Sequence, residues 1–268
     1  MQLTASLVLY NNDPCEFEIA IQSFLDGSNG FLYILDNSET PLCHPLFLNP
    51  RVFYKKSSAN LGFGRAHNLA FKNISHDSDI HLFMNPDVKF ESTVLPELIG
   101  FLGMHPEIGA LMPRIEYRDG SLQRLCKLLP TPLDLVVRRF LPIKQLRNWI
   151  NRRYEMHWLG QDRSFDVPSL SACFLLVRSK DFRYIGGFDE RYFMYLEDVD
   201  LVRRIGEFKR TVYYPLAHIV HGYARGSYKN TTLLYHHLRS AIAYFSKWGW
   251  WHDQFRAKKN KAALALRQ

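Results

Sequence analysis

The chain has 268 residues, of which 47% are hydrophobic and 22% charged, so it can bury the core of one large globular domain or two small ones. Its formal net charge of +8 indicates an anionic partner, which is nucleic acid, an anionic membrane surface or a phosphate-bearing substrate. The four cysteines match no zinc pattern, and no apolar run approaches the ~18 residues of a membrane span, which excludes a zinc module and an integral membrane protein.

Short apolar runs alternate with helical patterns through the first part of the chain. Buried strands are predicted at residues 3–9, 31–35, 52–54, 80–84 and 108–112. Between them, a helix begins at Asp13 as N-cap with Pro14 in its first turn and stops at Gly27, and further helices are predicted around 65–72 and 92–104. This alternation is typical of a doubly wound α/β sheet, in which ligands bind at the carboxyl ends of the strands.

Polar residues directly follow three of these predicted strands. They are Asn11-Asn12, Asp36-Asn37 and Asn85-Pro86-Asp87. Asn, Asp and Pro are also ordinary turn formers, but three such clusters at strand ends favour a ligand site at that edge. A carboxylate such as Asp87 suits Mg²⁺ or Mn²⁺ bound to substrate phosphates, and His221 would add a nitrogen ligand. The alternative for a single histidine is a purely structural side chain.

A basic and apolar segment occupies residues 122–153. Pro130, Pro132 and Pro142 divide it into short predicted helices. Two interpretations stay open: it lies on an anionic membrane face or holds a lipid-linked substrate, or it is a helical excursion with solvated basic edges. The first residues lack the basic and apolar regions of a signal peptide, so we expect a soluble or peripheral protein with free cysteines in a reducing cytosol.

The last part of the chain combines an acidic cluster with further strands and helices. Glu197-Asp198-Val199-Asp200 places three carboxylates within four residues, directly after an aromatic run. Acids beside apolar bulk are suited to proton transfer, although acids in a first helical turn also simply complement the helix dipole. A strand is predicted at 211–214 before Pro215, then a long helix at 230–248, and the basic tail is expected to fray.

Several common catalytic signatures are missing from the sequence. Gly62-Phe63-Gly64 lacks the third glycine of a dinucleotide loop, since position 67 is His, and it follows the third strand rather than the first. There is no P-loop, no GxSxG elbow and no HExxH motif. Nucleic-acid binding would depend on charge alone, because no recognition motif accompanies it.

Seven motifs in chain order resemble the inverting family 2 glycosyltransferases with a GT-A fold, and among them the bacterial rhamnosyltransferase branch that builds cell-surface polysaccharide. The resemblance spans roughly residues 3–249. The motifs are SLVLYN at 6–11, LDNS at 35–38, NLGFGRAHN at 60–68, MNPDV at 84–88, GGFDE at 186–190, FMYLEDVDL at 193–201, and His221 with Ser227.

The resemblance implies a fold and a division of the chain. The expected fold is α/β, a GT-A type doubly wound and mostly parallel central sheet flanked by helices (Rossmann-like), with a helical insertion and a C-terminal helix. Residues 1–268 would form one domain. Its parts would be a nucleotide-sugar-binding half at 1–115, the basic helical insertion at 119–165, an acceptor and catalytic half at 166–250, and the basic tail at 251–268.

The resemblance also implies roles for individual residues. Asp198 would be the general base, Asp87 and His221 would bind a divalent Mg²⁺ or Mn²⁺ ion, and Glu197 would contact the acceptor with Ser171 and Ala172. Asp36 would hydrogen-bond the base of the donor, and Arg65 would lie near its phosphates. The full donor-binding set would be Tyr10, Asn11, Asp36, Asn60, Gly62, Arg65, Asn68 and Asn85.

Two positions depart from the family's pattern. Many members carry Asp where this chain has Asn85, which leaves fewer charges for the metal. Relatives often carry Gly-Ala where this chain has Ser171-Ala172, a position that borders the acceptor.

The function implied is transfer of a sugar, L-rhamnose from dTDP-L-rhamnose, onto a polyprenyl-diphosphate-linked saccharide in the synthesis of O-antigen, capsule or cell wall. The protein would be cytoplasmic and peripheral at the cytoplasmic face of the inner membrane. Two alternatives stay open. One is transfer of galactofuranose, glucose or N-acetylglucosamine from a UDP-sugar. The other is a non-catalytic nucleotide-sugar-binding protein of polysaccharide assembly.

Overall fold

The computed structural model describes residues 1–74, 78–135, 144–222 and 231–267, so Ser227 lies outside the described residues. The strands are β1 (Leu3–Leu9), β2 (Phe31–Asp36), β3 (Val52–Lys56), β4 (Ile80–Met84), β5 (Val88–Lys89), β6 (Ile108–Glu116), β7 (Phe165–Asp166), β8 (Phe174–Arg178) and β9 (Arg210–His221). The helices are α1 (Pro14–Gly27), η1 (Pro45–Leu48), α2 (Phe63–Ile74), α3 (Val94–Met104), α5 (Lys144–Tyr154), α6 (Ser179–Tyr184), α7 (Glu197–Ile205), α8 (Thr231–Trp248) and α9 (Gln254–Ala265).

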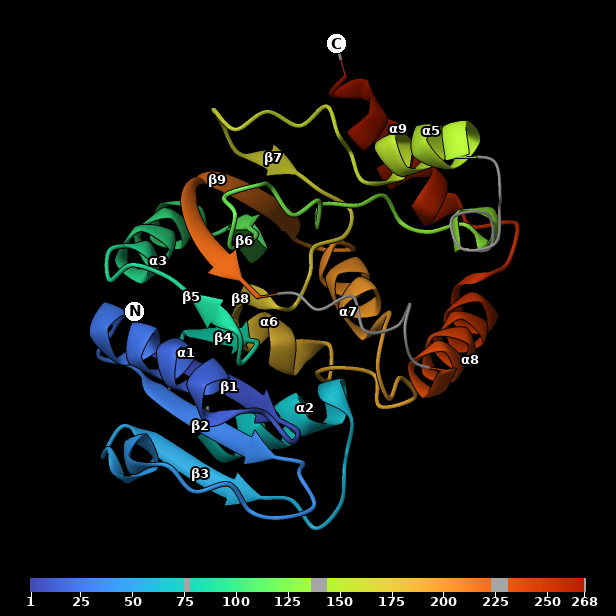
Figure 1. Cartoon of the computed structure of the whole chain (residues 1–268). Coiled ribbons are helices and arrows are strands. Elements are labelled where there is room, and N and C mark those ends of the chain that lie inside the picture. Colours follow the sequence, from blue (N-terminus) through green and yellow to red (C-terminus); the bar gives the residue numbers. More distant parts are fainter. Residues whose placement is uncertain (75–77, 136–143, 223–230, 268) are drawn as a thin grey trace.

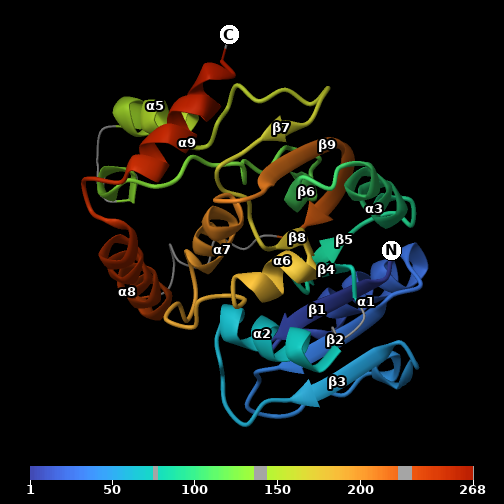
Figure 2. The ribbon, with the colours of Figure 1, turned by 180° about the vertical axis from the view of Figure 1, so that it is seen from behind.

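The centre of the molecule is one sheet with helices on both faces (Figures 1 and 2). Its strand order is β3-β2-β1-β4-β8-β6-β9-β5, and β7 pairs with β9. Successive side chains of β2 point to opposite faces: Leu32 and Ile34 join the large core that includes α1, whereas Tyr33 and Leu35 pack with Ala66 of α2. Burial on both faces explains why these strands read as continuous apolar runs in the sequence.

Parallel pairing of β2, β1 and β4 brings their polar carboxyl ends to one edge, as the sequence predicts. The backbone N–H of Asn37 donates to the carbonyl of Leu9 over 2.8 Å, and the N–H of Asn11 donates to Ser38 Oγ over 2.7 Å. Farther along, β8 runs antiparallel to both of its neighbours, β4 and β6. The doubly wound α/β fold with a mostly parallel sheet is therefore confirmed: β5, β7 and β8 run against the common direction of the other six strands.

The predicted strand at 211–214 is too short, because β9 continues through Pro215 to His221. The register of β9 against β6 shifts at this point: Pro113 pairs with Tyr214, and the next residue, Arg114, pairs with His218. Pro215 lies in the irregular stretch at this register shift. Because the regular strand pairing is interrupted there, the absence of a backbone N–H on Pro215 removes no hydrogen bond between the strands. The extension matters because it carries His221 back to the ligand edge of the sheet.

The prediction of a frayed tail is wrong, since most of it forms helix α9. Asp253 caps this helix by accepting from the N–H of Arg256 over 2.9 Å. The amide of Asn260 donates to the carbonyl of Leu129 and accepts from its N–H, both over 2.9 Å. These polar contacts tie α9 to the 122–135 segment, and hydropathy alone does not reveal them.

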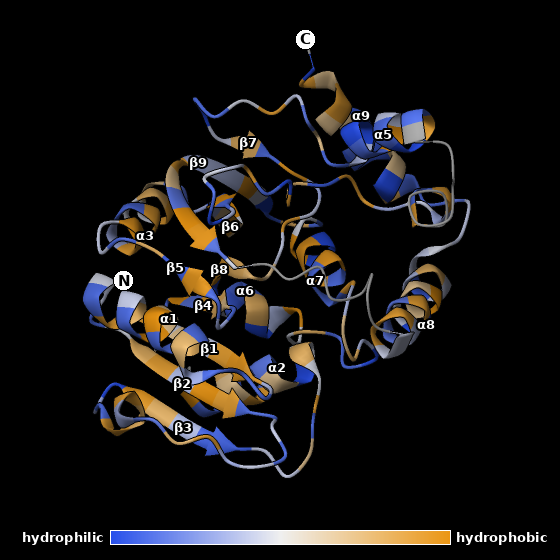
Figure 3. Ribbon diagram, in the orientation of Figure 1, coloured by the Kyte–Doolittle hydropathy of each residue, from blue (hydrophilic) through white to orange (hydrophobic). Residues whose placement is uncertain are grey.

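The hydropathy of the elements separates the sheet from the outer helices. Figure 3 shows β1, β4 and β9 mainly in hydrophobic colours and much of α5 and α9 in hydrophilic ones. Within the described ranges, every helix is either too short or too polar to cross a lipid bilayer.

Candidate active site

A pocket of about 360 Å³ opens between the ends of β4, β9 and α7. Residues far apart in the sequence meet there: the ends of two strands, the segment before β8 and the first turn of α7. Its lining includes six of the predicted site residues, Asn85, Ser171, Ala172, Glu197, Asp198 and His221. The pocket therefore brings residues predicted for the donor, the metal, the acceptor and the proton transfer into one space.

A strained turn aims the acidic cluster into this pocket. Tyr195 and Leu196 have φ values of 69° and 65°, in the left-handed region that residues other than glycine rarely adopt. Each such residue costs of order 1–3 kcal/mol, and the surrounding packing has to hold it. Leu196 packs against Tyr192 and Tyr244, and the Tyr195 ring stacks on His237 with centroids 5.0 Å apart. The strained turn directly precedes α7, so it sets where the acidic first turn of that helix lies. Strained backbone of this kind is concentrated at functional sites.

The carboxylate of Asp198 lies near backbone N–H donors and near the charge of Lys127. Its Oδ1 accepts from the N–H of Val199 over 2.8 Å. Burial raises the pKa of Asp198, whereas the charge of Lys127 and hydrogen bonds from the Val199 and Ala172 amides pull it back, and the net shift is upward. A carboxylate with a raised pKa beside a pocket is suited to take up a proton.

Glu197 is the more deeply buried of the two neighbouring acids, with 6% of its surface exposed. Its Oε2 has no hydrogen-bond partner among the residues that the structure describes. Burial, together with the negative charge of Asp198, raises the pKa of Glu197 well above its ordinary value. Lys127 and the backbone amides oppose the rise in the pKa of Asp198, whereas the charge of Asp198 adds to the rise in the pKa of Glu197.

Pairing of β5 with β9 brings the two predicted metal-binding residues together, since Val88 lies opposite His221. Asp87 Oδ1 lies 3.2 Å from His221 Nε2. Asn85 Nδ2 lies 3.1 Å from the same nitrogen. Among the described residues, no group of three or more acids, histidines or cysteines could hold a metal ion.

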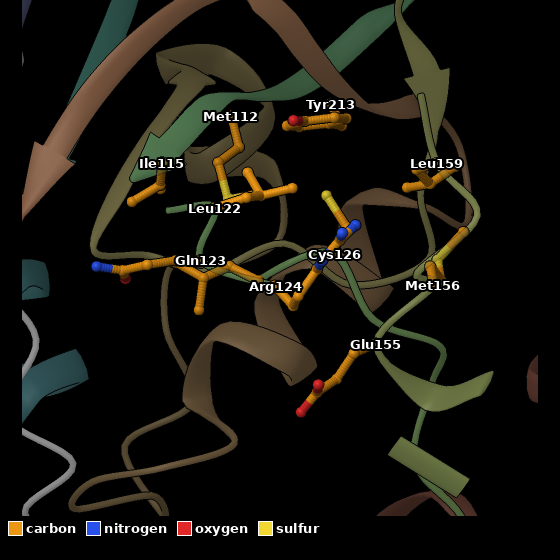
Figure 4. Close-up of a pocket in the computed structure, with 11 residues that line it drawn as sticks. Met112, Ile115, Leu122, Gln123, Arg124, Cys126, Glu155, Met156, Leu159 and Tyr213 are labelled. Atoms are coloured by element: carbon orange, nitrogen blue, oxygen red, sulfur yellow. The ribbon is translucent and has the colours of Figure 1, made fainter. Parts of the chain in front are cut away.

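Gln123 holds His221 from behind. Its Oε1 lies 3.0 Å from His221 Nδ1, and its Nε2 donates to the His221 carbonyl over 2.7 Å. The amide oxygen can only accept, so Nδ1 carries a proton in this contact, and Nε2 is the ring nitrogen that faces Asp87. Figure 4 shows Gln123 extending away from the other side chains of a small apolar cavity of about 10 Å³, which is close to the space of a single water. That small cavity is a gap in the packing. Gln123 instead contacts His221, which lines the larger pocket.

Asp36 is fully buried at the end of β2. Its carboxylate accepts from the N–H of Ser38 over 2.8 Å, the N–H of Leu42 over 3.0 Å and the hydroxyl of Tyr54 over 2.6 Å. Burial alone would raise its pKa, but these hydrogen bonds outweigh it and lower the pKa. Asp36 thus organises the loop after β2, and a base could reach the carboxylate only by replacing one of these donors. Beside this loop, Tyr10 and Asn11 are exposed.

The loop before α2 is joined to the segment before α7. Gly62 has a φ of 77°, and a Cβ there would lie 2.2 Å from the carbonyl of Phe193, so only glycine fits. Asn60 Oδ1 accepts from the Gly62 N–H over 2.9 Å and shapes the same turn. Arg65 is exposed and lies 3.4 Å from Glu190.

Asn68 joins α2 to the GGFDE turn. Its Oδ1 accepts from the N–H of Phe188 and its Nδ2 donates to the Phe188 carbonyl, both over 2.8 Å. These two hydrogen bonds fix the side-chain amide of this predicted donor-binding residue between the two segments.

Asp200, two residues after Asp198, is fully buried and faces away from the pocket's lining. Its carboxylate accepts from Lys247, Trp248 and Arg204, each over 2.7 Å. Arg204 lies one turn after Asp200 on the same helix. The network connects α7 to α8 and fixes the helix that carries Asp198.

Sequence reasoning missed Lys127 and Gln123, and it gave Asn37 no role of its own within the Asp36-Asn37 cluster. Lys127 is one of many cations in the basic segment, and Gln123 is an uncharged residue between two motifs. Asn37 is buried, and its Nδ2 donates to the Gly62 carbonyl over 3.2 Å. Nothing in the local pattern separates these residues from their neighbours, because their partners lie far away in the sequence.

Comparisons with known proteins extend this geometry. The chain is 32% identical over 235 residues to the N-acetylglucosaminyl-diphospho-decaprenol L-rhamnosyltransferase of Mycobacterium tuberculosis (strain ATCC 25618 / H37Rv), which covers 81% of this chain and 75% of that protein. It is 26% identical over 211 residues to the rhamnosyltransferase WbbL of Escherichia coli (strain K12), covering 69% of this chain and 70% of that one. No protein-family model matches the chain.

Solved structures share the fold. GalNAc-T7 with UDP, GalNAc and Mn²⁺ superposes with a TM-score of 0.63 at 12% identity, over 83% of this chain and 43% of that one. S. aureus TarS superposes with a TM-score of 0.56 at 14% identity, over 85% of this chain and 38% of that one. Both of these chains are longer than the part that this chain matches, and at such low identity the likeness concerns the GT-A fold alone.

Proposed function

The chain belongs to the rhamnosyltransferase branch of the family 2 glycosyltransferases, and from that premise we propose that it moves L-rhamnose from dTDP-L-rhamnose onto a polyprenyl-diphosphate-linked saccharide. The observation that carries this proposal is one pocket lined by both Asp198 and His221, with Asp87 beside that histidine. The relative from M. tuberculosis is named for transfer to a diphospho-decaprenol-linked N-acetylglucosamine, which supports an acceptor of the same class. The product would enter a cell-surface polysaccharide such as O-antigen, capsule or cell wall.

The reaction is a single displacement at the anomeric carbon of the donor. Asp198 takes the proton from an acceptor hydroxyl, whose oxygen forms the new bond to the anomeric carbon. The bond from that carbon to the diphosphate breaks, and its electron pair leaves with the nucleoside diphosphate. Attack on the face opposite the leaving group inverts the configuration. Glu197, whose pKa is raised by burial and by the charge of Asp198, lines the pocket together with Ser171 and Ala172, where an acceptor sugar would lie.

The donor set at the end of β4 fits a divalent cation. Asp87 offers a carboxylate and His221 a lone pair on Nε2, and Gln123 fixes the imidazole as the partners of metal-binding histidines usually do. Mg²⁺ or Mn²⁺ held by these two residues would neutralise charge on the leaving diphosphate.

We expect Asp87→Ala to weaken donor binding in the presence of metal by about tenfold or more, because half of the protein's ligand set is lost. Calorimetric titration with dTDP-L-rhamnose, with and without Mn²⁺, measures this directly. Asp26→Ala, which removes an exposed acid on α1, is the matched control. Equal donor affinity in Asp87→Ala and wild type at saturating Mn²⁺ would remove Asp87 from this role.

We expect Gln123→Leu to lower Mn²⁺ affinity by about 10- to 100-fold, because His221 loses the acceptor that orients its ring. Electron paramagnetic resonance of Mn²⁺ titrated in the presence of dTDP reads out binding without turnover. Gln22→Leu on the exposed side of α1 is the control. If the two variants bind Mn²⁺ equally well, Gln123 has no part in positioning the ligand.

In this proposal residues 1–115 form the donor half, and residues 166–250 supply the base and the acceptor side. The 119–165 insertion contributes Lys127 to the lining of the pocket. Tyr10, Asn11 and Asn60 are exposed near the loop that Asp36 organises. Arg65 is exposed beside Glu190, and its side chain would leave this partner to contact the donor phosphates. A membrane-bound acceptor would keep the enzyme at the cytoplasmic face of the inner membrane as a peripheral protein.

The donor is tested by thermal shift with a panel of nucleotide sugars in Mn²⁺ or Mg²⁺. A ligand that binds only the native state raises the melting temperature, so dTDP-L-rhamnose should give the largest rise. A larger rise with UDP-galactofuranose, UDP-glucose or UDP-N-acetylglucosamine would assign the donor to that sugar instead. No rise with any of them would contradict the proposed function.

A further inference from the structure

The outer side of α8 is apolar where a surface helix is normally polar. Tyr235, Leu238 and Ile242 are spaced as neighbours along one face of the helix, and 60%, 46% and 58% of their surfaces are exposed. The opposite side faces the protein, since His237 lines the active-site pocket and Tyr244 is fully buried. One side of helix α8 therefore lines the pocket, and the other side presents an exposed apolar stripe.

The apolar stripe continues onto neighbouring elements. Trp250 and Trp251 follow α8 directly and are 41% and 68% exposed. On α5, Leu146 and Trp149 are 43% and 63% exposed. Figures 1 and 2 place α5, α8 and the connection from α8 to α9 along one edge of the molecule in both views. We call this set the outer apolar surface: Leu146, Trp149, Tyr235, Leu238, Ile242, Trp250 and Trp251.

The exposed charges on α5, α8 and the following helix α9 have a single sign. They include Arg152, Arg239, Lys258 and Lys261. Residues 144–154 contain no acid, and residues 231–267 contain only Asp253, whose carboxylate is buried against Arg203 at 2.8 Å. A second copy of the chain would bring like charges face to face, which disfavours self-association through this surface. An anionic lipid surface complements it.

We infer that the outer apolar surface docks the enzyme on an anionic lipid bilayer beside the pocket. This inference rests on the proposed function for its purpose: the lipid of the acceptor stays in the membrane while its sugar passes α8 into the pocket. Trp and Tyr partition to the membrane–water interface, and the cations add attraction to anionic headgroups. The combination matters because one weak signal gives only marginal, reversible binding, whereas two together anchor a protein. Both α5, which ends the 122–153 segment, and α8, with the two tryptophans that follow it, contribute to this surface.

Co-sedimentation with lipid vesicles tests the inference. Wild-type protein should bind vesicles of phosphatidylcholine and phosphatidylglycerol in equal parts, and binding should weaken with added salt or with phosphatidylcholine alone. The double variant Leu238→Ser/Trp251→Ser should bind about tenfold less or weaker still. The control Leu48→Ser/Tyr184→Ser removes side chains that are 87% and 79% exposed elsewhere, and it should bind as the wild type does.

Two results would overturn the inference: wild-type protein that stays in solution with the mixed vesicles, or a double variant that binds them as well as its control. A concentration-dependent dimer lost only in the double variant would assign the surface to a second copy of the chain. Transfer to a water-soluble, short-chain acceptor separates this inference from the proposed function. Both variants should keep wild-type rates in that assay, whereas a failure of all three proteins there would contradict the function and leave vesicle binding unaffected.

Discussion

Asp198→Asn should reduce the rate of sugar transfer by at least about 10²- to 10⁴-fold, because the amide keeps the size of the side chain but cannot accept the acceptor's proton. Donor binding should survive, since Asp198 lines the pocket with Ser171 and Ala172, where we propose that the acceptor binds. Rates from a radiolabelled donor, together with calorimetric donor affinity, separate the two effects. Asp26→Asn, on the exposed side of α1, is the control. Near-normal turnover in Asp198→Asn would remove this residue from the role of base.

The same variant should leave the fold intact. Burial raises the pKa of Asp198, which means that the folded protein disfavours its charged form, so replacing the carboxylate with a neutral amide does not weaken the native state near neutral pH. The pH profile supplies an independent check. Activity should rise with pH as Asp198 loses its proton, and Lys127→Met should move this limb to higher pH, because Lys127 lowers the pKa of Asp198. An unmoved limb would mean that another group controls it.

Asp200→Ala should lower the free energy of unfolding by about 3–5 kcal/mol, as expected when one member of a buried ionic network is removed. Asp200 is fully buried, and its loss leaves Arg204 and the Trp248 N–H without their carboxylate partner. Denaturation in urea measures the change. Asp200→Asn, which keeps one acceptor oxygen, should lose less.

This pair of neighbouring aspartates makes a sharp contrast on one helix. Asp198 variants should fold normally and fail in transfer, whereas Asp200 variants should lose stability first. An Asp200→Ala protein that unfolds at the wild-type urea concentration would show that the network with Lys247, Trp248 and Arg204 contributes little.

Much of the fold can be predicted from the sequence because its signals are local. The strands of the first half are continuous apolar runs, and Asp13 with Pro14 marks the start of α1. The errors have non-local causes. Pro215 reads as a strand end, yet a register shift against β6 absorbs it, and the basic tail forms α9 because Asn260 finds Leu129. Neither partner can be identified from a neighbouring stretch of sequence.

The site divides in the same way. Asp87, Asp198 and His221 stand in recognisable motifs, and the sheet and α7 bring them toward one pocket. Gln123 and Lys127 stand in no motif, and only the strand pairing and the course of the insertion reveal that they hold His221 and charge-balance Asp198. Asn68 stands in a motif but forms hydrogen bonds to Phe188, which a residue-by-residue reading of the motif cannot foresee.

The most direct test of the central claim is the product of the reaction. Purified protein, Mn²⁺ and dTDP-L-rhamnose are incubated with a polyprenyl-diphosphate-linked N-acetylglucosamine, and the lipid fraction is analysed by mass spectrometry and NMR. The expected product is the acceptor extended by one rhamnose, with the anomeric configuration inverted relative to the donor, formed by wild type and lost in Asp198→Asn. An unmodified acceptor after complete incubation, or a product that retains the donor's configuration, would contradict it.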